Sequence, residues 1–209
     1  MDKNFAIFDM DGTLVDSMPY WKNLSPEYLS SKGISEIPKD ILEKITPMTV
    51  KESSRFFVEQ FGLDATPETV ADEIHAMMGI HYIEDIPIRE GVEEYLEKLK
   101  ERGVRMCVAS ATVEPLMDAC LTRLGVRHYF EFTLSCDTVG AGKNSPLVYL
   151  TAAERLGAKP EETAVYEDSC FAAATAKKAG FYLCGVYDPV SHAHWEELQA
   201  LSHEAIAHW

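Results

Sequence analysis

Short apolar runs alternate with amphipathic stretches over the second half of this chain. Runs at 104–110, 132–135, 163–168 and 182–187 have the length of buried strands, and residues with helical spacing precede each of them. Another apolar run, 4–8, lies near the start of the chain. Strands that are apolar throughout and separated by helices are typical of a parallel sheet covered on both faces. The pattern therefore predicts an α/β fold.

Between residues 16 and 85 the apolar positions follow helical spacing only, and prolines divide the stretch into several helices. We therefore expect two domains. Residues 1–15 and 86–209 would form the core, a doubly wound parallel sheet of the Rossmann-like kind with right-handed crossovers. Residues 16–85 would form an α-helical cap domain inserted into that core.

Composition narrows the classes of function. Of the 209 residues, 46% are hydrophobic and 25% charged, and the formal net charge of −15 argues against a nucleic-acid partner. No apolar run approaches the roughly 20 residues that cross a bilayer, so we expect no membrane association. The first residues resemble a buried strand and not a signal peptide, which predicts a cytoplasmic protein. We expect no disulfides, because the five cysteines form no paired motif. We also expect a monomer.

Polar side chains follow the predicted strands where each strand ends. The carboxyl ends of parallel strands meet at one edge of the sheet, where ligands of such folds bind. The candidate chemical groups at that edge are Asp9, Asp11, Ser110, Lys143, Glu167 and Asp168.

Several carboxylates at one edge would repel each other unless a cation held them together. Mg²⁺ prefers oxygen ligands and often shares them with a substrate phosphate, so we expect Asp9 and Asp168 to bind it. Gly12 allows a tight turn that exposes N–H groups to an anion. Lys143 and Ser110 would bind the oxygens of a phosphoryl group.

The motifs DMDGTLVDS (9–17), VASAT around Ser110, GKNSP around Lys143 and YEDS (166–169) follow one another in order. In order and spacing the chain resembles the haloacid dehalogenase-like hydrolase superfamily, in its phosphatase and β-phosphoglucomutase-like subgroup with a helical cap. The resemblance covers the whole chain.

The resemblance implies a Mg²⁺-dependent phosphatase of small phosphate monoesters that forms an aspartyl-phosphate. Asp9 would be the nucleophile. Asp11 would first protonate the leaving oxygen and then deprotonate the attacking water. The implied metal ligands are Asp9, the backbone carbonyl of Asp11, Asp168 and, directly or through water, Glu167. The implied phosphate-binding residues are Ser110, Ala111 and Lys143.

Substrate choice is expected to depend on the cap, because the core site contacts only the phosphoryl group and the metal. Tyr20 and Trp21 open the first cap helix, and the loop 46–49 contributes Met48 and Thr49. This aromatic and Met-rich lining favours a flat or apolar leaving group over a heavily hydroxylated one.

Four other functions remain as alternatives. A dehalogenase or a phosphonate hydrolase of the superfamily would lack the second aspartate, which is present here as Asp11. A sugar phosphomutase of the β-phosphoglucomutase type would carry a histidine and an arginine at positions that align with Trp21 and Val50. A binding or regulatory module without activity would not require every catalytic motif residue to be intact.

Other polar residues have simpler interpretations. Asp16 and Ser17 are interpreted as linker or helix N-cap residues. His192 and His194 are expected in an exposed loop, and His81 on a helix surface.

Overall fold

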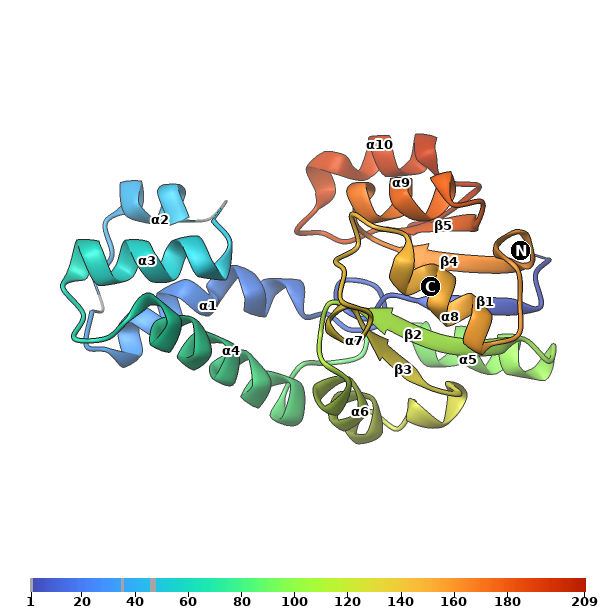
Figure 1. Ribbon diagram of the computed structural model, residues 1–209, viewed down its shortest axis with the longest axis horizontal. Helices are drawn as coiled ribbons and strands as arrows, with labels where there is room; N and C mark the ends of the chain where they lie inside the picture. Colours follow the sequence, from blue (N-terminus) through green and yellow to red (C-terminus); the bar gives the residue numbers. More distant parts are fainter. Residues whose placement is uncertain (1, 35, 46–47) are drawn as a thin grey trace. The chain divides into compact units, whose positions relative to one another are not determined.

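The computed structural model describes residues 2–34, 36–45 and 48–209 (Figure 1). The chain divides into two compact units. One consists of Met1–Met18 and Ile86–Trp209, and the other of Pro19–Asp85. Among the described residues, no helix combines the length and the apolar character that crossing a membrane would require.

The first unit, called the core below, contains a six-stranded sheet in the order β3-β2-β1-β4-β5-β6, and every neighbouring pair is parallel. The strands are β1 (Phe5–Phe8), β2 (Arg105–Ser110), β3 (Thr133–Ser135), β4 (Thr163–Glu167), β5 (Tyr182–Val186) and β6 (Glu204–Ile206). The predicted parallel α/β sheet is confirmed. The pattern had not indicated β6, whose three residues alternate only between half-buried and exposed positions.

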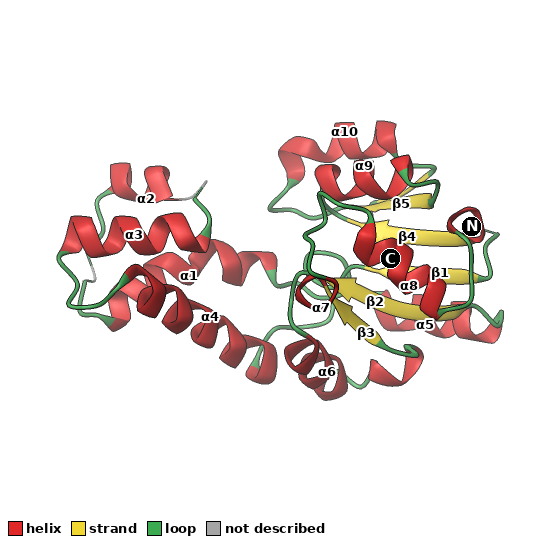
Figure 2. Ribbon diagram, viewed as in Figure 1, coloured by secondary structure: helices red, strands yellow, loops and turns green. Residues whose placement is uncertain are grey.

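Helices cover both faces of this sheet (Figure 2). They are α5 (Val92–Glu101), α6 (Glu114–Arg123), α7 (Cys136–Val139), α8 (Leu147–Arg155), α9 (Cys170–Lys178) and α10 (Trp195–Leu201). Side chains of a strand alternate between faces. Ile7 and Val165 therefore pack with Tyr149 of α8, whereas Phe8 stacks on Tyr166, which meets Tyr95 of α5. The sheet is buried on both faces, which explains its continuously apolar strands.

The central strands determine where a ligand can bind. β1 lies between β2 and β4, with Phe8 level with Val108 and Tyr166. The chain leaves β1 toward β2 on one side and later returns to β4 on the other. The order of the strands thus reverses beside β1, and in such sheets the crevice at the reversal is where ligands bind.

The second unit, called the helical unit below, contains α1 (Met18–Ser31), α2 (Lys39–Ile45), α3 (Val50–Phe61) and α4 (Pro67–Glu84). Its buried side chains include Tyr28, Phe57, Ile74 and Met78. Thr49 caps α3 in a capping box with Glu52, and Thr66 caps α4 ahead of Pro67. Local signals therefore define where these helices begin.

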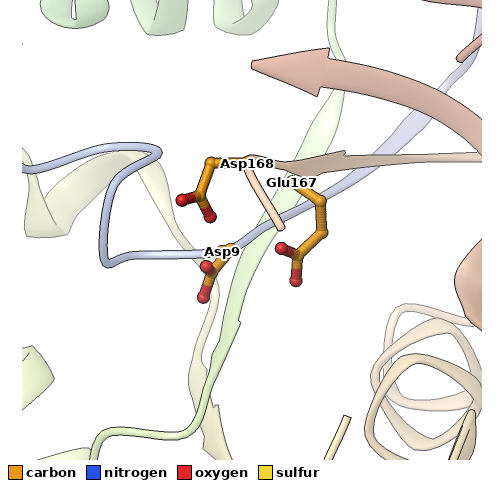
Figure 3. A group of neighbouring side chains, drawn as sticks. All are labelled: Asp9, Glu167 and Asp168. Carbon is orange, nitrogen blue, oxygen red and sulfur yellow. The ribbon is translucent and has the colours of Figure 1, made fainter. Parts of the chain in front are cut away.

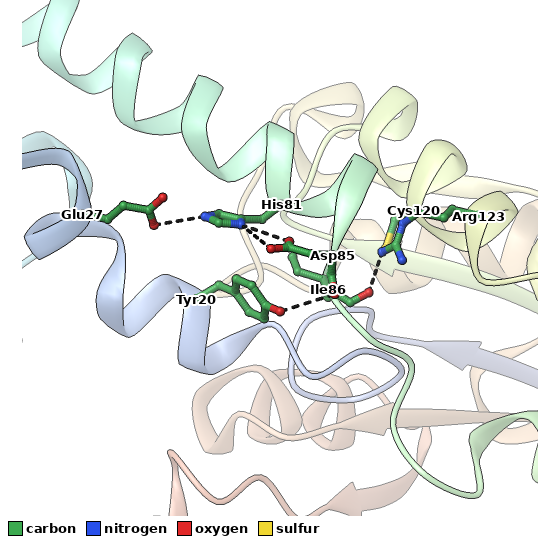
Figure 4. Close-up of polar contacts among 7 residues, drawn as sticks. All are labelled: Tyr20, Glu27, His81, Asp85, Ile86, Cys120 and Arg123. Carbon is green, nitrogen blue, oxygen red and sulfur yellow. Dashed lines mark hydrogen bonds and ion pairs between the residues drawn. The ribbon is translucent and has the colours of Figure 1, made fainter. Parts of the chain in front are cut away.

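A polar cluster joins the two ends of the helical unit (Figure 4). His81 contacts Glu27 of α1 through Nε2 (3.1 Å) and Asp85 through Nδ1 (3.0 Å). The Tyr20 hydroxyl donates to the carbonyl of Asp85 (3.3 Å), so the start of α1 is hydrogen-bonded to the last residue of the unit. Within the core, Arg123 donates to the carbonyl of Ile86 (2.5 Å).

Candidate active site

The chain turns sharply where β1 ends. The N–H of Leu14 donates to the carbonyl of Met10 (2.9 Å), which closes a tight loop directly after Asp9. Gly12 in this loop has φ 73°, and a Cβ added there would lie 2.5 Å from Oδ2 of Asp168. Glycine is therefore needed both for the backbone conformation and for the close approach of the loop to the end of β4.

Lys143 lies between the carboxylate that directly follows β1 and the carboxylate at the end of β4. The Lys143 Nζ is 2.5 Å from Oδ1 of Asp9 and 2.6 Å from Oε1 of Glu167. The hydroxyl of Tyr149, on α8, donates to the same Glu167 oxygen (2.6 Å). All of these side chains are buried, with Glu167 fully inaccessible. Lys143 thus belongs to the site and is not a solvated loop lysine.

The negative charge of this cluster exceeds the charge that Lys143 supplies. Burial raises the pKa of Asp9 to about 8, and the charge of Glu167 acts in the same direction, whereas Lys143 opposes it. Burial, together with the charges of Asp9 and Glu167, also raises the pKa of Asp168. Burial by itself lowers the pKa of Lys143, but attraction to Asp9 and Glu167 leaves it raised. A further cation beside Asp9 and Asp168 would favour their ionised forms and oppose this rise in pKa.

Three carboxylates are placed to receive that cation. Asp9, Glu167 and Asp168 each offer an oxygen, and these oxygens lie within 4.8 Å of one another (Figure 3). Among the described residues, Oε2 of Glu167 is buried without a hydrogen-bond partner. Buried hard oxygen donors suit a divalent metal such as Mg²⁺. The residues therefore fit a divalent cation that Asp9 and Asp168 would hold, with Glu167 beside them.

Asp11 is held by hydroxyl groups. Ser17 donates to its Oδ1 (2.7 Å), and Thr112 and Ser110 donate to its Oδ2 (2.8 and 3.3 Å). Asp11 itself is half-buried, whereas Asp9 is buried. The two aspartates of the first motif therefore have different surroundings: Asp9 contacts a lysine and faces carboxylates, and Asp11 accepts bonds from hydroxyls.

Most of the predicted chemical groups lie at one edge of the core sheet. The groups lie at the ends of β1, β2 and β4 and in the loop before α8: Asp9, Asp11, Ser110, Lys143, Glu167 and Asp168. Ala111 follows Ser110 directly and is exposed.

The predicted cap residues have contacts within the helical unit. Trp21 Nε1 donates to the hydroxyl of Tyr82 (3.2 Å), and Tyr20 contacts the carbonyl of Asp85. Thr49 caps α3, and Met48 is half-buried. Thr46 and Pro47 of the same loop lie outside the described residues. The role of these residues in substrate choice stays a prediction.

The sequence interpretation missed three polar residues of the site. Ser17 had been interpreted as a linker or N-cap residue, but its side chain is fully buried against Asp11. Thr112 lies two residues after Ser110, so its proximity to the motif was an available signal. Tyr149 falls within the apolar spacing of α8, and nothing in that pattern marks its hydroxyl as part of a charged cluster.

A cavity of about 460 Å³ opens beside Asp168 in the core. Its lining includes Ser169, Phe171, Ser191 and His194. His194 and Phe171 are exposed, with Phe171 at 62%. The acidic edge therefore has room for a small ligand on this side.

Comparison with known proteins identifies the family. The chain matches the family described as haloacid dehalogenase-like hydrolase over residues 4–180. It is 29% identical to the phosphorylated carbohydrates phosphatase of Thermotoga maritima, over 84% of this chain and 81% of that protein. It is 31% identical to hexitol phosphatase B of Escherichia coli K12, over 78% of this chain and 74% of that protein.

A crystal structure of a candidate β-phosphoglucomutase from Thermotoga maritima aligns with a TM-score of 0.81 at 27% identity, covering 97% of this chain and 94% of that one. The predicted resemblance is thus confirmed. So is the prediction of a hydrolase acting on phosphate monoesters, through the family and its named phosphatases. From the strand order, the acidic edge and these comparisons together, the chain belongs to the haloacid dehalogenase-like hydrolase family.

Proposed function

We propose that this protein is a Mg²⁺-dependent phosphatase that hydrolyses a small phosphate monoester through an aspartyl-phosphate on Asp9. The observation that carries the proposal is the buried cluster in which Lys143 bridges Asp9 and Glu167, with Asp168 beside them. Relatives named as phosphatases of phosphorylated carbohydrates and of hexitols support a small phosphorylated substrate.

In the first half-reaction, a carboxylate oxygen of Asp9 attacks phosphorus and the bond from phosphorus to the leaving oxygen breaks. Asp11 donates its proton to that oxygen, so the product leaves as a neutral alcohol. In the second, Asp11 takes a proton from water, whose oxygen attacks phosphorus. The bond from phosphorus to Asp9 then breaks and releases inorganic phosphate. The hydroxyl groups of Ser17 and Thr112 hold the Asp11 carboxyl in place for both transfers.

Lys143 has two tasks in this mechanism. It favours the ionised, nucleophilic form of Asp9, because its charge opposes the rise in pKa that burial causes. It also offsets negative charge on the transferring phosphoryl group. A Mg²⁺ ion bound by Asp9, the Asp11 carbonyl and Asp168, with Glu167 beside it, would polarise the phosphoryl oxygens and shield the carboxylates from each other.

The helical unit is proposed to be the cap, with Tyr20, Trp21, Met48 and Thr49 contributing to substrate choice. The cavity beside Asp168 supplies room for part of the leaving group. A monomeric, cytoplasmic enzyme remains our expectation. A β-phosphoglucomutase activity is not proposed, because Trp21 and Val50 stand where that subgroup has its histidine and arginine.

The test is turnover of an aryl phosphate by the purified protein. We expect hydrolysis that EDTA abolishes, Mg²⁺ restores and Ca²⁺ suppresses, since the larger and looser Ca²⁺ shell misplaces the attacking carboxylate. Full activity after exhaustive chelation would contradict the metal assignment. A panel of sugar phosphates, polyol phosphates and aryl phosphates, measured with wild type and with Trp21→Ala and Met48→Ala, then tests the cap assignment. Unchanged relative rates in both variants would remove these residues from substrate choice.

A further inference from the structure

A half-buried arginine contacts the loop that carries the first motif. The Arg89 guanidinium donates to the carbonyl of Gly12 (2.6 Å), to the carbonyl of Tyr187 (2.6 Å) and to Oδ2 of Asp188 (2.9 Å). Only 14% of the Arg89 side chain is exposed, and none of the Asp188 side chain. Arg89 lies between the end of the helical unit and α5, and Asp188 follows β5. All of these residues belong to the core.

The contact at Gly12 fixes a peptide next to the metal ligands. The Gly12 N–H donates to the carbonyl of Val15 (3.1 Å), while the Gly12 carbonyl accepts from Arg89. In a trans peptide the N–H and the preceding C=O point in opposite directions, so the bond to Val15 sets the direction of the Asp11 carbonyl. With both polar groups of Gly12 held, the loop has little freedom to rotate.

The same loop packs against Asp168. A Cβ at Gly12 would lie 2.5 Å from Oδ2 of Asp168, so the glycine backbone is in close contact with this carboxylate. Asp168 and Asp188 also border the same small pocket. A shift of the Gly12 carbonyl would therefore move the Asp11 carbonyl and Asp168 relative to each other.

Arginine suits this position for a geometric reason. Its planar fork donates in several directions at once, whereas a lysine ammonium is a compact point charge. Asp188 is itself held in place, because its Oδ1 accepts from the N–H groups of Val190 (2.8 Å) and Ser191 (3.2 Å). A buried ion pair contributes little net stability by itself. Stability alone therefore does not explain why Arg89 pairs with Asp188 at this position.

We propose that Arg89, oriented by Asp188, is a positioning residue for the metal site: it holds the Gly12 carbonyl and thereby places the Asp11 carbonyl beside Asp168. This inference rests on the proposed function, because it assumes that Asp9, the Asp11 carbonyl and Asp168 bind Mg²⁺. Groups that orient metal ligands from behind typically change metal affinity or activity by about 10-fold to 100-fold when they are replaced.

The test uses Arg89→Lys, which keeps the charge and removes the fork. Its matched control is Arg105→Lys. Arg105 also joins a carboxylate, Glu131 (2.6 Å), to a backbone carbonyl, that of Leu156 (2.6 Å), but it lies at the opposite end of the sheet. Mg²⁺ affinity is measured from the rise of Tm with Mg²⁺ concentration, which does not require turnover.

We expect Arg89→Lys to weaken Mg²⁺ binding by at least about 10-fold and Arg105→Lys by less than about 2-fold. Aryl phosphate turnover should show the same shift in Mg²⁺ dependence, with much of the rate recovered at high Mg²⁺. Asp188→Asn provides a second route, because it keeps the Oδ1 acceptor for Val190 and Ser191 but presents an amide to Arg89. We expect it to weaken Mg²⁺ binding by about 3-fold to 10-fold.

Mg²⁺ affinity within 2-fold of wild type in both Arg89→Lys and Asp188→Asn would overturn the inference while leaving the proposed function intact. An equal loss in Arg105→Lys would overturn it as well, since the effect would then not depend on the Gly12 contact. A wild-type protein whose Tm does not respond to Mg²⁺ would overturn both the inference and the proposed metal dependence. The proposed function is tested separately, by the loss of phosphatase activity in Asp9→Asn. The Arg89 inference is tested by Mg²⁺ affinity, for which Arg105→Lys should retain a Mg²⁺-dependent Tm.

Discussion

The core and the helical unit each contain a Lys–Glu–Tyr cluster with the same contacts and different burial. In the core, Lys143 and Tyr149 bind Glu167, each at 2.6 Å, and at most 8% of the lysine and glutamate side chains is exposed. In the helical unit, Lys32 lies 2.8 Å from Glu73, with side chains 35% and 40% exposed, and Tyr28 donates to Glu73 at 2.6 Å.

A carboxylate beside each lysine has its pKa shifted, and the two shifts are in opposite directions. Hydrogen bonds from Lys32 and Tyr28 lower the pKa of Glu73. Desolvation acts to raise it, but this effect is smaller because the Glu73 side chain is partly exposed to solvent. In the core, burial raises the pKa of Asp9, which shares Lys143 with Glu167, to about 8. The same residue types thus form a partly exposed ion pair in one unit and a buried cluster beside further carboxylates in the other. Burial, and not residue type, distinguishes the cluster in the core from the one in the helical unit.

The largest expected effect is on phosphatase activity, when a carboxylate of the core is replaced instead of a carboxylate of the helical unit. Asp9→Asn should reduce phosphatase activity by more than about 10³-fold, because the change removes the nucleophile and a metal ligand while keeping nearly the same shape. Glu73→Gln, the control, should leave kcat/KM within about 2-fold. Both are measured with an aryl phosphate at saturating Mg²⁺. Activity of Asp9→Asn within tenfold of wild type would end the proposed mechanism.

The next effect distinguishes the two aspartates of the first motif. Asp11→Asn should slow turnover by about 10² to 10⁴, the usual cost of a missing acid or base. Mg²⁺ binding should persist, because the backbone carbonyl of Asp11 is retained. The measurement combines single-turnover kinetics with the Mg²⁺ dependence of Tm. Ser17→Ala serves as the graded comparison, since it frees one Asp11 oxygen and should lower the rate by less than Asp11→Asn. A larger loss in Ser17→Ala would contradict this order.

Removing the lysine from each Lys–Glu–Tyr cluster compares their contributions to stability. Without added metal, Lys143→Met should lower the free energy of unfolding by about 3 kcal/mol, since it leaves buried carboxylates without their cation. Lys32→Met should change it by about 0–1 kcal/mol, because its ion pair is solvent-screened. Urea unfolding monitored by circular dichroism measures both. Equal losses in the two variants would contradict the contrast between the clusters.

The smallest expected effect is a pH dependence in the helical unit. Burial acts to lower the pKa of His81, but hydrogen bonds with Glu27 and Asp85 outweigh it and leave the pKa raised above 6.5. A raised folded-state pKa stabilises the fold fully below about pH 6.5, and this stabilisation is lost as the pH rises through the folded-state value. His81→Gln should therefore lower Tm more at pH 6 than at pH 8.

The control for this comparison is His75→Gln, which changes an exposed histidine on the same helix, α4. His75 lies outside the contacts with Glu27 and Asp85, so the Tm differences of this variant at the two pH values are the baseline for those of His81→Gln. If His81→Gln shows the same Tm loss at both pH values, its hydrogen bonds contribute without a change of charge.

The strands and helices of the core followed from local pattern. Each apolar run is short and continuous, and the helices between them carry their own spacing, so neither depends on distant residues. The exception, β6, has only three residues, and its alternation is too brief to distinguish from a loop. The position of the chemical groups was equally predictable, because the carboxyl ends of parallel strands lie at one edge of the sheet. These groups are Asp9, Asp11, Ser110, Lys143, Glu167 and Asp168.

Contacts across large sequence separations depended on the tertiary structure. Thr112 and Asp11 are 101 residues apart, and Arg89 and Asp188 are 99 apart. No periodic signal encodes such a pair, since each partner taken alone is an ordinary loop threonine, arginine or aspartate. Whether Lys143 is a solvated lysine or a buried cation was likewise undecided by its small neighbours. The chain sequence by itself determined which groups reach the sheet edge. Burial by the packed helices decided which of them lose water, share charge and bind one another.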